Sequence, residues 1–521
     1  MVEDHVRKLA AELGITLPPL RVSGSDPVLP SVFRVGTAAA IAVGAATAAV
    51  AAFRGDGSEA AVDVREAAVA FRDERHLRIN GAPVDLWAPL SGDYRTADGW
   101  VRLHCNFDHH RDAALMALDL PAGANADAVI RACAGRGAVE IEEAVTRAGG
   151  CAAAMRDRAE WRGHPQFRAV AASPLVRLTR IDGPDGSDGP ARPDGPDCLD
   201  GPDGPDTSNG SDGPDRSDGP DGPDGFDRPD GPDGPDGPDR PIGPVGFETR
   251  GGIEAKGGTG ARPGTRGERA LEGVRVLDLT RVLSGPYATR VLASHGARVL
   301  RVGAGHLPEV PGAVIGSAFG KRSCHLDLRT RQGRAGLRAL VAGADVFVQS
   351  YRPGALEALG FGPRELAAIR PGIVCVDISA YGGHGPWAGR RGFDSLVQIA
   401  CGIAHEGGDG SRPCPLPAQV LDHATGHLAA FGAVAGLLRR SVEGGSWRVE
   451  LSLARTAHWL DGLGRVDGAA TPEPDVADLL QETESAFGRL THLRPPGTVG
   501  GRSPYWSSPP PRQGEHPPAW W

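Results

Sequence analysis

From residue 182 to residue 246 the chain consists almost entirely of Gly, Pro and Asp, so no packed core can form there. The triplet Gly-Pro-Asp recurs, as in residues 201–206, and the segment holds 18 Asp but only 4 Arg. Proline has no amide hydrogen for a helix or a strand ladder, and like charges repel one another along an extended chain. We therefore expect a disordered acidic spacer with polyproline II bias, and folded structure only on either side of it.

Composition divides the 521 residues into four parts around this spacer. The whole chain is 40% apolar and 23% charged, which is ordinary for a globular protein with more than one core. We expect a mixed α/β body at 1–181, the disordered linker at 182–269, a Rossmann-like core at 270–467 and a Pro-rich tail at 468–521.

Charge and cysteine usage argue against several classes of protein. The net charge is −9 for the chain and −14 for the spacer, which leaves +5 for the rest, and no aromatic-interleaved basic run indicates a nucleic-acid partner. The eight cysteines stand singly, without a CxxC pair or a Cys/His spacing, so they predict neither a zinc site nor a disulfide framework. The first residues lack the pattern of a signal peptide, and Val35–Phe53 is rich in Ala, Gly and Thr, which favours a buried helix over a membrane span. We expect a cytoplasmic protein without a membrane partner.

Alternating strand and helix patterns after the spacer predict a parallel sheet. Apolar runs indicate strands at 274–279, 297–302, 345–349 and 373–378, with helices between them at 287–294, 332–342 and 363–369. This succession of βαβ units predicts an α/β fold: a Rossmann-like, mostly parallel open sheet with a smaller α+β part. Since no GxGxxG follows the first strand, we do not expect a nicotinamide or flavin dinucleotide.

The part before the spacer shows other signals. Asp98-Gly99 between 94–96 and 100–105 predicts a β-hairpin, and helices are expected at 138–148 and 152–161. An internal echo is also present: 36–67 and 426–454 share an Ala-rich helix, a Gly loop and a short alternating strand.

Ordered motifs in the core resemble the family III CoA-transferases, the group that includes formyl-CoA transferase and carnitine CoA-transferase. The matching segments are 271–279 with Ser284-Gly285-Pro286, 320–323 with 326–328, 344–346 with 351–354, 392–394 with Gln398, and 421–422 opening a helix through Leu438. The first part resembles the later half of such a protein, at 96–101 and 164–166, and the tail from Phe487 resembles the family's C-terminal segment. The resemblance thus implies that the halves are rearranged in this chain: a part like the later half of a family member comes first, and a part like its first half follows the spacer.

Asp422 matches the nucleophile of this family. The resemblance implies transfer of CoA from an acyl-CoA to a carboxylic acid through a covalent aspartyl intermediate, with CoA as a substrate and no other cofactor. Asp422 precedes the predicted helix, whose N–H groups and dipole are expected to keep the carboxylate ionised. In the internal echo 30–37 stands opposite Asp422 and contains no acid, so only one catalytic centre is expected. The glycines at 402, 407, 408 and 410 are of a suitable type for a loop that passes the acyl group over the nucleophile.

The resemblance also implies a CoA-binding set spread over four segments. These residues are Val282, Leu283, Ser284, Leu326, Asp327, Leu328, Arg329, Ser350, Tyr351, Arg352, Arg391, Gly392, Phe393 and Asp394.

Two departures from the family pattern keep alternatives open. Racemases of the same fold have a histidine where this chain has Phe393, which argues against an acyl-CoA racemase or isomerase, although His423 and His427, expected at the helix surface, stand near Asp422. Gly303-Ala304-Gly305-His306 replaces the acidic segment that usually follows the second strand, and with the rearranged halves this motivates a non-catalytic CoA-binding or scaffolding protein.

The resemblance implies interlocked homodimers. The internal echo would either preserve such a dimer or imitate it within one chain.

One cluster contains residue types that bind metals, but no second group of ligands accompanies it, so no metal site is expected. Its members are His104, Asp108, His109, His110 and Asp112.

Overall fold

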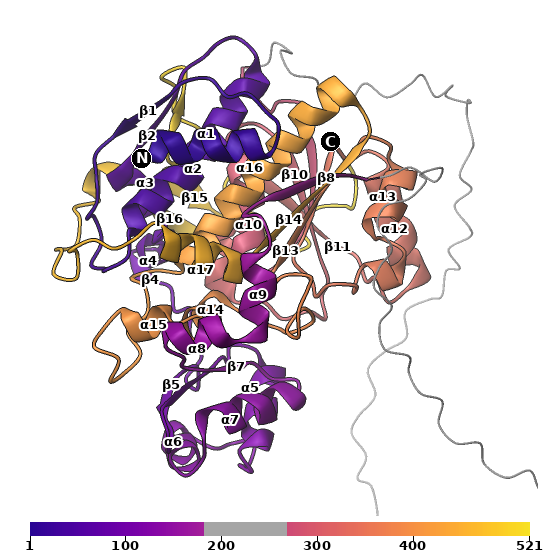
Figure 1. Ribbon diagram of the computed structural model, residues 1–521. Coiled ribbons are helices and arrows are strands. Elements are labelled where there is room, and N and C mark those ends of the chain that lie inside the picture. Colours follow the sequence, from indigo (N-terminus) through magenta and orange to yellow (C-terminus); the bar gives the residue numbers. More distant parts are fainter. Residues whose placement is uncertain (182–267) are drawn as a thin grey trace, which may run out of the picture. The chain divides into compact units, whose positions relative to one another are not determined.

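A computed structural model describes residues 1–181 and 268–521. Its centre is a seven-stranded sheet with the strand order β11-β10-β9-β12-β13-β14-β8 (Figure 1). The strands are β8 (Arg177–Ile181), β9 (Arg275–Leu279), β10 (Arg298–Gly303), β11 (Lys321–His325), β12 (Val346–Gln349), β13 (Val374–Ser379) and β14 (Ser446–Ser452). All pairs are parallel except β8 with β14. The predicted α/β fold with a mostly parallel sheet is therefore confirmed.

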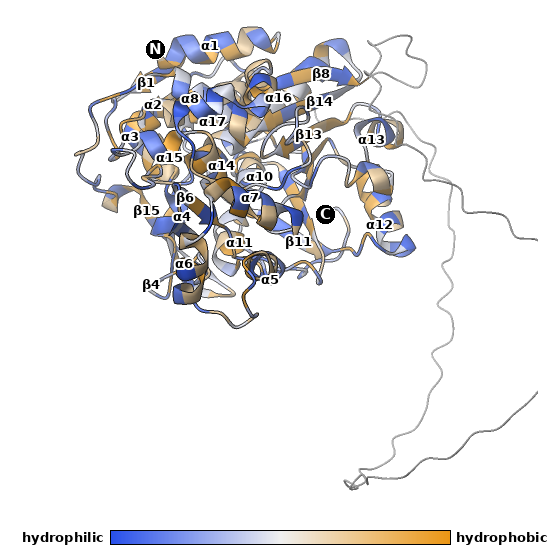
Figure 2. Cartoon of the chain, turned by 60° about the horizontal axis from the view of Figure 1, so that its bottom comes forward, coloured by the Kyte–Doolittle hydropathy of each residue, from blue (hydrophilic) through white to orange (hydrophobic). Residues whose placement is uncertain are grey.

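α-Helices follow the strands of this sheet. They are α10 (Ser284–Ser294), α11 (Pro311–Ser317), α12 (Arg331–Val341), α13 (Pro363–Ile369), α14 (Asp394–Ala400), α15 (Ile403–Glu406), α16 (Val420–Glu443) and α17 (Leu453–Gly462). Helices α12 and α13 lie within one residue of their predicted ranges, whereas α16 continues to Glu443 rather than ending at Leu438. Helix α10 begins at Ser284 rather than at residue 287, because proline fits the first turn of a helix, where its missing N–H has no partner to lose. Figure 2 shows that α1 and α12 carry both hydrophilic and hydrophobic residues.

The part before residue 182 shares a sheet with the core. Its helices are α1 (Val2–Glu12), α2 (Val35–Arg54), α3 (Val64–Ala70), α4 (Asp73–His76), α5 (Asp108–Ala117), α6 (Ala126–Ala134), α7 (Ala138–Arg147), α8 (Arg158–Gly163) and α9 (Pro165–Ala171). Strand β8 pairs with β14 antiparallel, with Arg180 opposite Trp447 and Leu178 opposite Val449. The described residues accordingly form one compact unit. Except for residues 268 and 269, the predicted disordered linker lies outside the described residues, and the four-part division stays a prediction.

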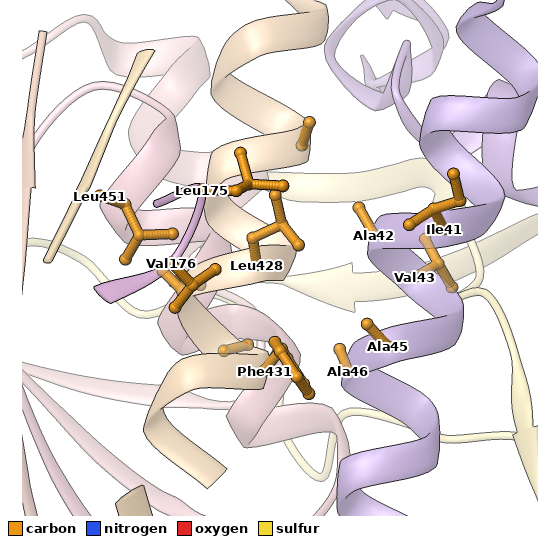
Figure 3. Close-up of a cluster of buried hydrophobic side chains, with 14 of the residues drawn as sticks. Ile41, Ala42, Val43, Ala45, Ala46, Leu175, Val176, Leu428, Phe431 and Leu451 are labelled. Carbon is orange, nitrogen blue, oxygen red and sulfur yellow. The ribbon is translucent and has the colours of Figure 1, made fainter. Parts of the chain in front are cut away.

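Helix α2 is buried over nearly its whole length. It is long and apolar enough to cross a membrane by length and composition, yet 94% of its most apolar stretch is buried inside the protein. Its small side chains allow close packing against α16: Ala42, Ala45 and Ala46 face Leu428 and Phe431 (Figure 3). The expected buried helix is confirmed.

Three smaller sheets complete the fold. Strands β5 (Gly92–Arg95) and β6 (Trp100–Leu103) form the predicted hairpin, and β7 (Ala152–Ala154) extends it. Strands β15 (Leu480–Ser485) and β16 (Gly488–Leu493) of the tail join β3 (Arg78–Ile79) and β4 (Ala82–Pro83). Strands β1 (Leu20–Ser23), β2 (Ala60–Asp63) and β17 (Thr498–Val499) form the third sheet.

The helix predicted at 152–161 is wrong. Ala152–Ala154 is a fully buried strand, with Ala153 opposite Arg102, and the following helix begins only at Arg158. Alanine favours helices by propensity, but the free edge of β6 supplies hydrogen bonds that override this preference. Asp157 then caps α8 by accepting a bond from the Glu160 N–H.

Candidate active site

A cavity of about 420 Å³ opens where β9, β12 and β13 end. Carboxyl ends of parallel strands meet at one edge of a sheet, which is the usual place for a ligand in an open α/β fold. We call it the Asp422 cavity. Ten of the predicted site residues line it: Val282, Leu283, Ser284, Ser350, Tyr351, Arg352, Arg391, Gly392, Phe393 and Asp422.

Other predicted residues do not reach this cavity. Leu326, Asp327, Leu328 and Arg329 follow β11 and are not among the lining residues, and Asp327 pairs with Arg329 at 2.7 Å. Asp394 is completely buried and has no surface for a ligand in this state. Of the four glycines at 402–410, none lines the cavity; Gly402 instead lies beside Arg158.

Asp422 lies inside α16 rather than before it. Asp422 is the third residue of the helix and is 7% exposed. Its carboxyl group accepts a hydrogen bond from the Ser284 N–H at the start of α10. The close approach of the two helices requires Gly426, where a Cβ would lie 2.7 Å from the Ser284 carbonyl oxygen. Val282, two residues before Ser284, has a φ of 70°, a strained conformation for a branched residue.

The surroundings of Asp422 oppose the ionised form that the start of the helix was expected to favour. Burial raises the pKa of Asp422 well above its ordinary value, and the neighbouring acids Asp394 and Glu74 raise it further. The hydrogen bond from the Ser284 N–H lowers the pKa, but by less. The helix dipole and one N–H group do not offset the loss of water around a buried charge. Burial also raises the pKa of Asp394, to about 6.

Asp394 accepts a hydrogen bond from the backbone of Asp422 and so holds it in position. Its Oδ2 accepts a 2.8 Å hydrogen bond from the Asp422 N–H, and its Oδ1 accepts one from the Gln398 side chain. The Gln398 oxygen in turn accepts a 2.7 Å bond from the Leu416 N–H. These contacts fix the first turn of α16 and so the position of the Asp422 backbone.

One wall of the cavity comes from the part of the chain before residue 182. Phe107, His109 and His110, at the start of α5, line the cavity, and we call them the α5 wall. His110 is buried, and its ring centroid lies 5.8 Å from that of Phe393. No group of three His, Cys, Asp or Glu side chains that could hold a metal ion occurs among residues 1–181 and 268–521. In the sequence these histidines belong to a cluster of metal-ligand types, and nothing in their spacing indicates that they pack against the core.

Comparison with known proteins finds a family for the part of the chain that holds Asp422. Residues 271–465 match CoA-transferase family III. This part of the chain belongs to that family.

Two curated relatives are similar to the family III core. The human succinyl-CoA:glutarate CoA-transferase is 35% identical over 188 residues, which cover 33% of this chain and 42% of the relative. The succinyl-CoA–D-citramalate CoA-transferase of Chloroflexus aurantiacus is 32% identical over 192 residues, covering 33% of this chain and 46% of the relative.

A solved structure is similar as well. Like the curated relatives, it is matched over only part of its length. The crystal structure of Rv3272 from M. tuberculosis is 32% identical, covers 37% of this chain and 58% of that chain, and has a TM-score of 0.35. The curated relatives are matched over roughly 28% to 53% of their length.

Two buried acids of α4 contact α10 and α16, the helices that carry Ser284 and Asp422. Tyr287 donates a 2.6 Å hydrogen bond to Asp73, and Arg290 pairs with the same oxygen at 2.6 Å. His423 Nε2 lies 2.9 Å from Glu74 Oε2. His423 and His427 are both buried, which corrects the expectation that they lie at the helix surface: α2 and α10 cover that side of α16.

The first turn of α2 repeats the first turn of α16. The residues that precede the two helices, Arg34 and Gln419, have the same backbone angles, φ −78° with ψ 63° and 62°. Asp26 accepts bonds from the Gly36 and Thr37 N–H groups at 2.9 and 2.6 Å, just as Asp394 accepts from Asp422. The third residue of α2 is Thr37, so the repeated element has no carboxyl group at the position of Asp422.

These two supporting aspartates provide a matched pair of variants. We expect Asp26→Ala to lower the free energy of unfolding by about 0.5–2 kcal/mol, as the loss of a helix cap does, and to leave transfer activity within about twofold. We expect Asp394→Ala to lower kcat at least about tenfold, because the Asp422 backbone loses its anchor. Chemical unfolding and steady-state kinetics check both. Equal loss of activity in the two variants would contradict the supporting role of Asp394.

Proposed function

We propose that the protein transfers CoA from an acyl-CoA thioester to a carboxylic acid, with Asp422 as nucleophile. The observation that carries this proposal is the Asp422 cavity itself, where the buried acid meets the segments 282–284, 350–352 and 391–393. The family III relatives whose names specify CoA transfer between acids support the same chemistry.

The reaction would pass through covalent intermediates on Asp422. The deprotonated carboxylate attacks the acyl-CoA carbonyl, the C–S bond breaks, and CoA leaves as a thiolate from an acyl-aspartyl anhydride. The thiolate then attacks the aspartyl carbonyl, which releases the first acid and leaves an aspartyl-CoA thioester. The acceptor carboxylate attacks this thioester and expels the thiolate, and the thiolate takes the new acyl group from the second anhydride, so that the Asp422 carboxylate is regenerated.

The start of α10 has two features that suit these steps. The Ser284 N–H contacts the Asp422 carboxyl group, and the positive end of the α10 dipole favours the negative charge that develops on the attacked oxygen. The Ser284 hydroxyl is buried and has no hydrogen-bond partner among the described residues, so it is free to bind a substrate oxygen.

Intact-mass measurement with a nucleophilic trap tests the proposal. The protein is incubated briefly with a mixed acyl-CoA panel and hydroxylamine. We expect a hydroxamate adduct on the wild type, located at Asp422 by peptide mapping, and no adduct on Asp422→Ala. If no adduct forms although CoA binds, exchange of the acyl α-proton with deuterium would instead support an acyl-CoA racemase, and the absence of any turnover a non-catalytic CoA-binding protein.

A further inference from the structure

Glu74 of α4 reaches the helix that carries Asp422. Its Oε2 lies 2.9 Å from Nε2 of His423, the residue that directly follows Asp422 in α16. The His423 side chain is fully buried, and that of Glu74 is 8% exposed. Burial of a carboxyl group costs free energy unless the group is hydrogen-bonded. The contact with His423 therefore accounts for the buried position of Glu74.

Two aromatic rings pack against the imidazole of His423. The Tyr287 ring meets it edge-on with ring centroids 4.4 Å apart, and the Phe71 ring stacks on it with centroids 5.5 Å apart. These rings, together with the Glu74 oxygen at Nε2, restrict rotation of the imidazole. Because His423 follows Asp422 in the first turn of α16, a fixed imidazole restrains the backbone of that turn.

Asp73, the residue before Glu74, makes the matching contact with α10. Its Oδ2 accepts 2.6 Å hydrogen bonds from the Tyr287 hydroxyl group and from Arg290 Nη1. All three side chains are buried. Since α10 begins at Ser284, adjacent acids of one four-residue helix connect the two helices whose first turns meet in the active site.

The contact between the first turns of α10 and α16 depends on how these helices are held. The Ser284 N–H donates a hydrogen bond to the Asp422 carboxyl group, and a hydrogen bond weakens steeply when its geometry changes. Misplacement of a reacting group by about 1 Å can slow a reaction about 100-fold. Glu74 does not line the Asp422 cavity, so any effect on the reaction must pass through the helices.

We propose that Glu74 is a positioning residue of the transfer reaction, which acts on Asp422 through His423. The contact holds the first turn of α16 against α10 and so keeps the Asp422 carboxyl group at the Ser284 N–H. The part of the chain before residue 182 then contributes two elements to the site: the α5 wall, which lines the cavity, and α4, which holds the nucleophile helix. The inference rests on the proposed function, because it takes Asp422 as the nucleophile.

Three variants of Glu74 test the contact by steady-state kinetics. Glu74→Gln keeps a side chain of the same length that can bond to Nε2 in either tautomer of His423, so we expect kcat within about twofold of the wild type. Glu74→Asp keeps the acid but is one methylene shorter, and we expect kcat to fall at least about fivefold. Glu74→Ala removes the contact, so we expect kcat to fall at least about tenfold while the KM for acyl-CoA changes less than about twofold.

Glu66→Ala is the matched control. Glu66 of α3 is also partly buried, but it pairs with Arg494 of the tail at 3.1 Å rather than with α10 or α16. We expect this variant to lose stability in urea unfolding without a loss of kcat. Binding of free CoA shows that each variant is folded.

Hydrogen–deuterium exchange gives a readout that does not depend on transfer. We expect the peptide that spans 419–428 to exchange at least about threefold faster in Glu74→Ala than in the wild type, and at the wild-type rate in Glu66→Ala and Glu74→Gln. The exchange therefore reports on the position of the first turn of α16 even in a protein without activity.

A wild-type kcat in Glu74→Ala would overturn the inference, and so would a Glu66→Ala or Glu74→Gln protein that is as slow as Glu74→Ala. These outcomes are distinct from failure of the proposed function. Faster exchange in Glu74→Ala without any Asp422 adduct on the wild type would remove the nucleophile and keep α4 as the element that holds α16. An adduct on the wild type, with unchanged exchange and kcat in Glu74→Ala, would do the reverse.

Discussion

Asp422→Asn should abolish CoA transfer and at the same time stabilise the fold at neutral pH. Loss of the nucleophile removes both covalent intermediates, so we expect kcat to fall at least about 1,000-fold. The raised pKa of Asp422 means that the unfolded chain releases a proton that the folded protein holds. Stability from this group is therefore fully present below the ordinary pKa of Asp and is lost as the pH rises toward the raised value. The Asp422→Asn protein loses no stability in this way, because an asparagine side chain does not release a proton in this pH range.

The sign of this effect can be measured directly. Thermal unfolding of the wild type and of Asp422→Asn from pH 4 to pH 9 should show similar melting temperatures at the acid end and an increasing advantage of the variant above it. Asp409→Asn is the control, because hydrogen bonds from Ser411 lower the pKa of this exposed carboxyl group. That variant should gain no stability and keep its activity. An active Asp422→Asn protein would rule out the proposed chemistry.

The family III core could be predicted from the sequence because its signals are local. Apolar runs such as 274–279 and 373–378, which form β9 and β13, are typical of strands buried on both faces, and Pro363 marks the first turn of α13. The motifs in the loops after β9, β12 and β13 supplied nine of the predicted residues that line the Asp422 cavity, and the motif at the start of α16 supplied Asp422 itself. Since parallel strands bring such loops to one edge, the order of the motifs was enough to gather them.

The features that could not be predicted depend on distant contacts. Ala152–Ala154 forms a strand because β6 lies beside it, and three alanines contain no sign of that edge. The α5 wall lines the cavity because a segment far earlier in the chain packs against the core, which the spacing of His109 and His110 does not reveal. The raised pKa of Asp422 comes from burial beside Asp394 and Glu74, a property of the packed protein rather than of the helix start.

Lys321→Met should be among the most destabilising single substitutions in the chain. The Lys321 side chain is 1% exposed, and its ammonium group lies 2.9 Å from Asp278 Oδ2, 2.8 Å from the Pro286 carbonyl oxygen and 2.7 Å from the Thr289 hydroxyl. It connects β9, β11 and the first turn of α10 behind the Asp422 cavity. Removal of the cation leaves Asp278 charged, fully buried and without its counterion, so we expect a loss of about 3–5 kcal/mol in the free energy of unfolding.

A double variant separates the uncompensated charge from lost packing. In Asp278→Asn with Lys321→Met no buried charge remains at this position, and the asparagine can still bond to Thr280 and Thr289, the threonine partners of Asp278. We therefore expect urea unfolding to show a smaller loss for the double variant than for Lys321→Met alone. A double variant less stable than Lys321→Met would mean that packing of the lysine stem, rather than the charge of Asp278, holds β9 and β11 to α10.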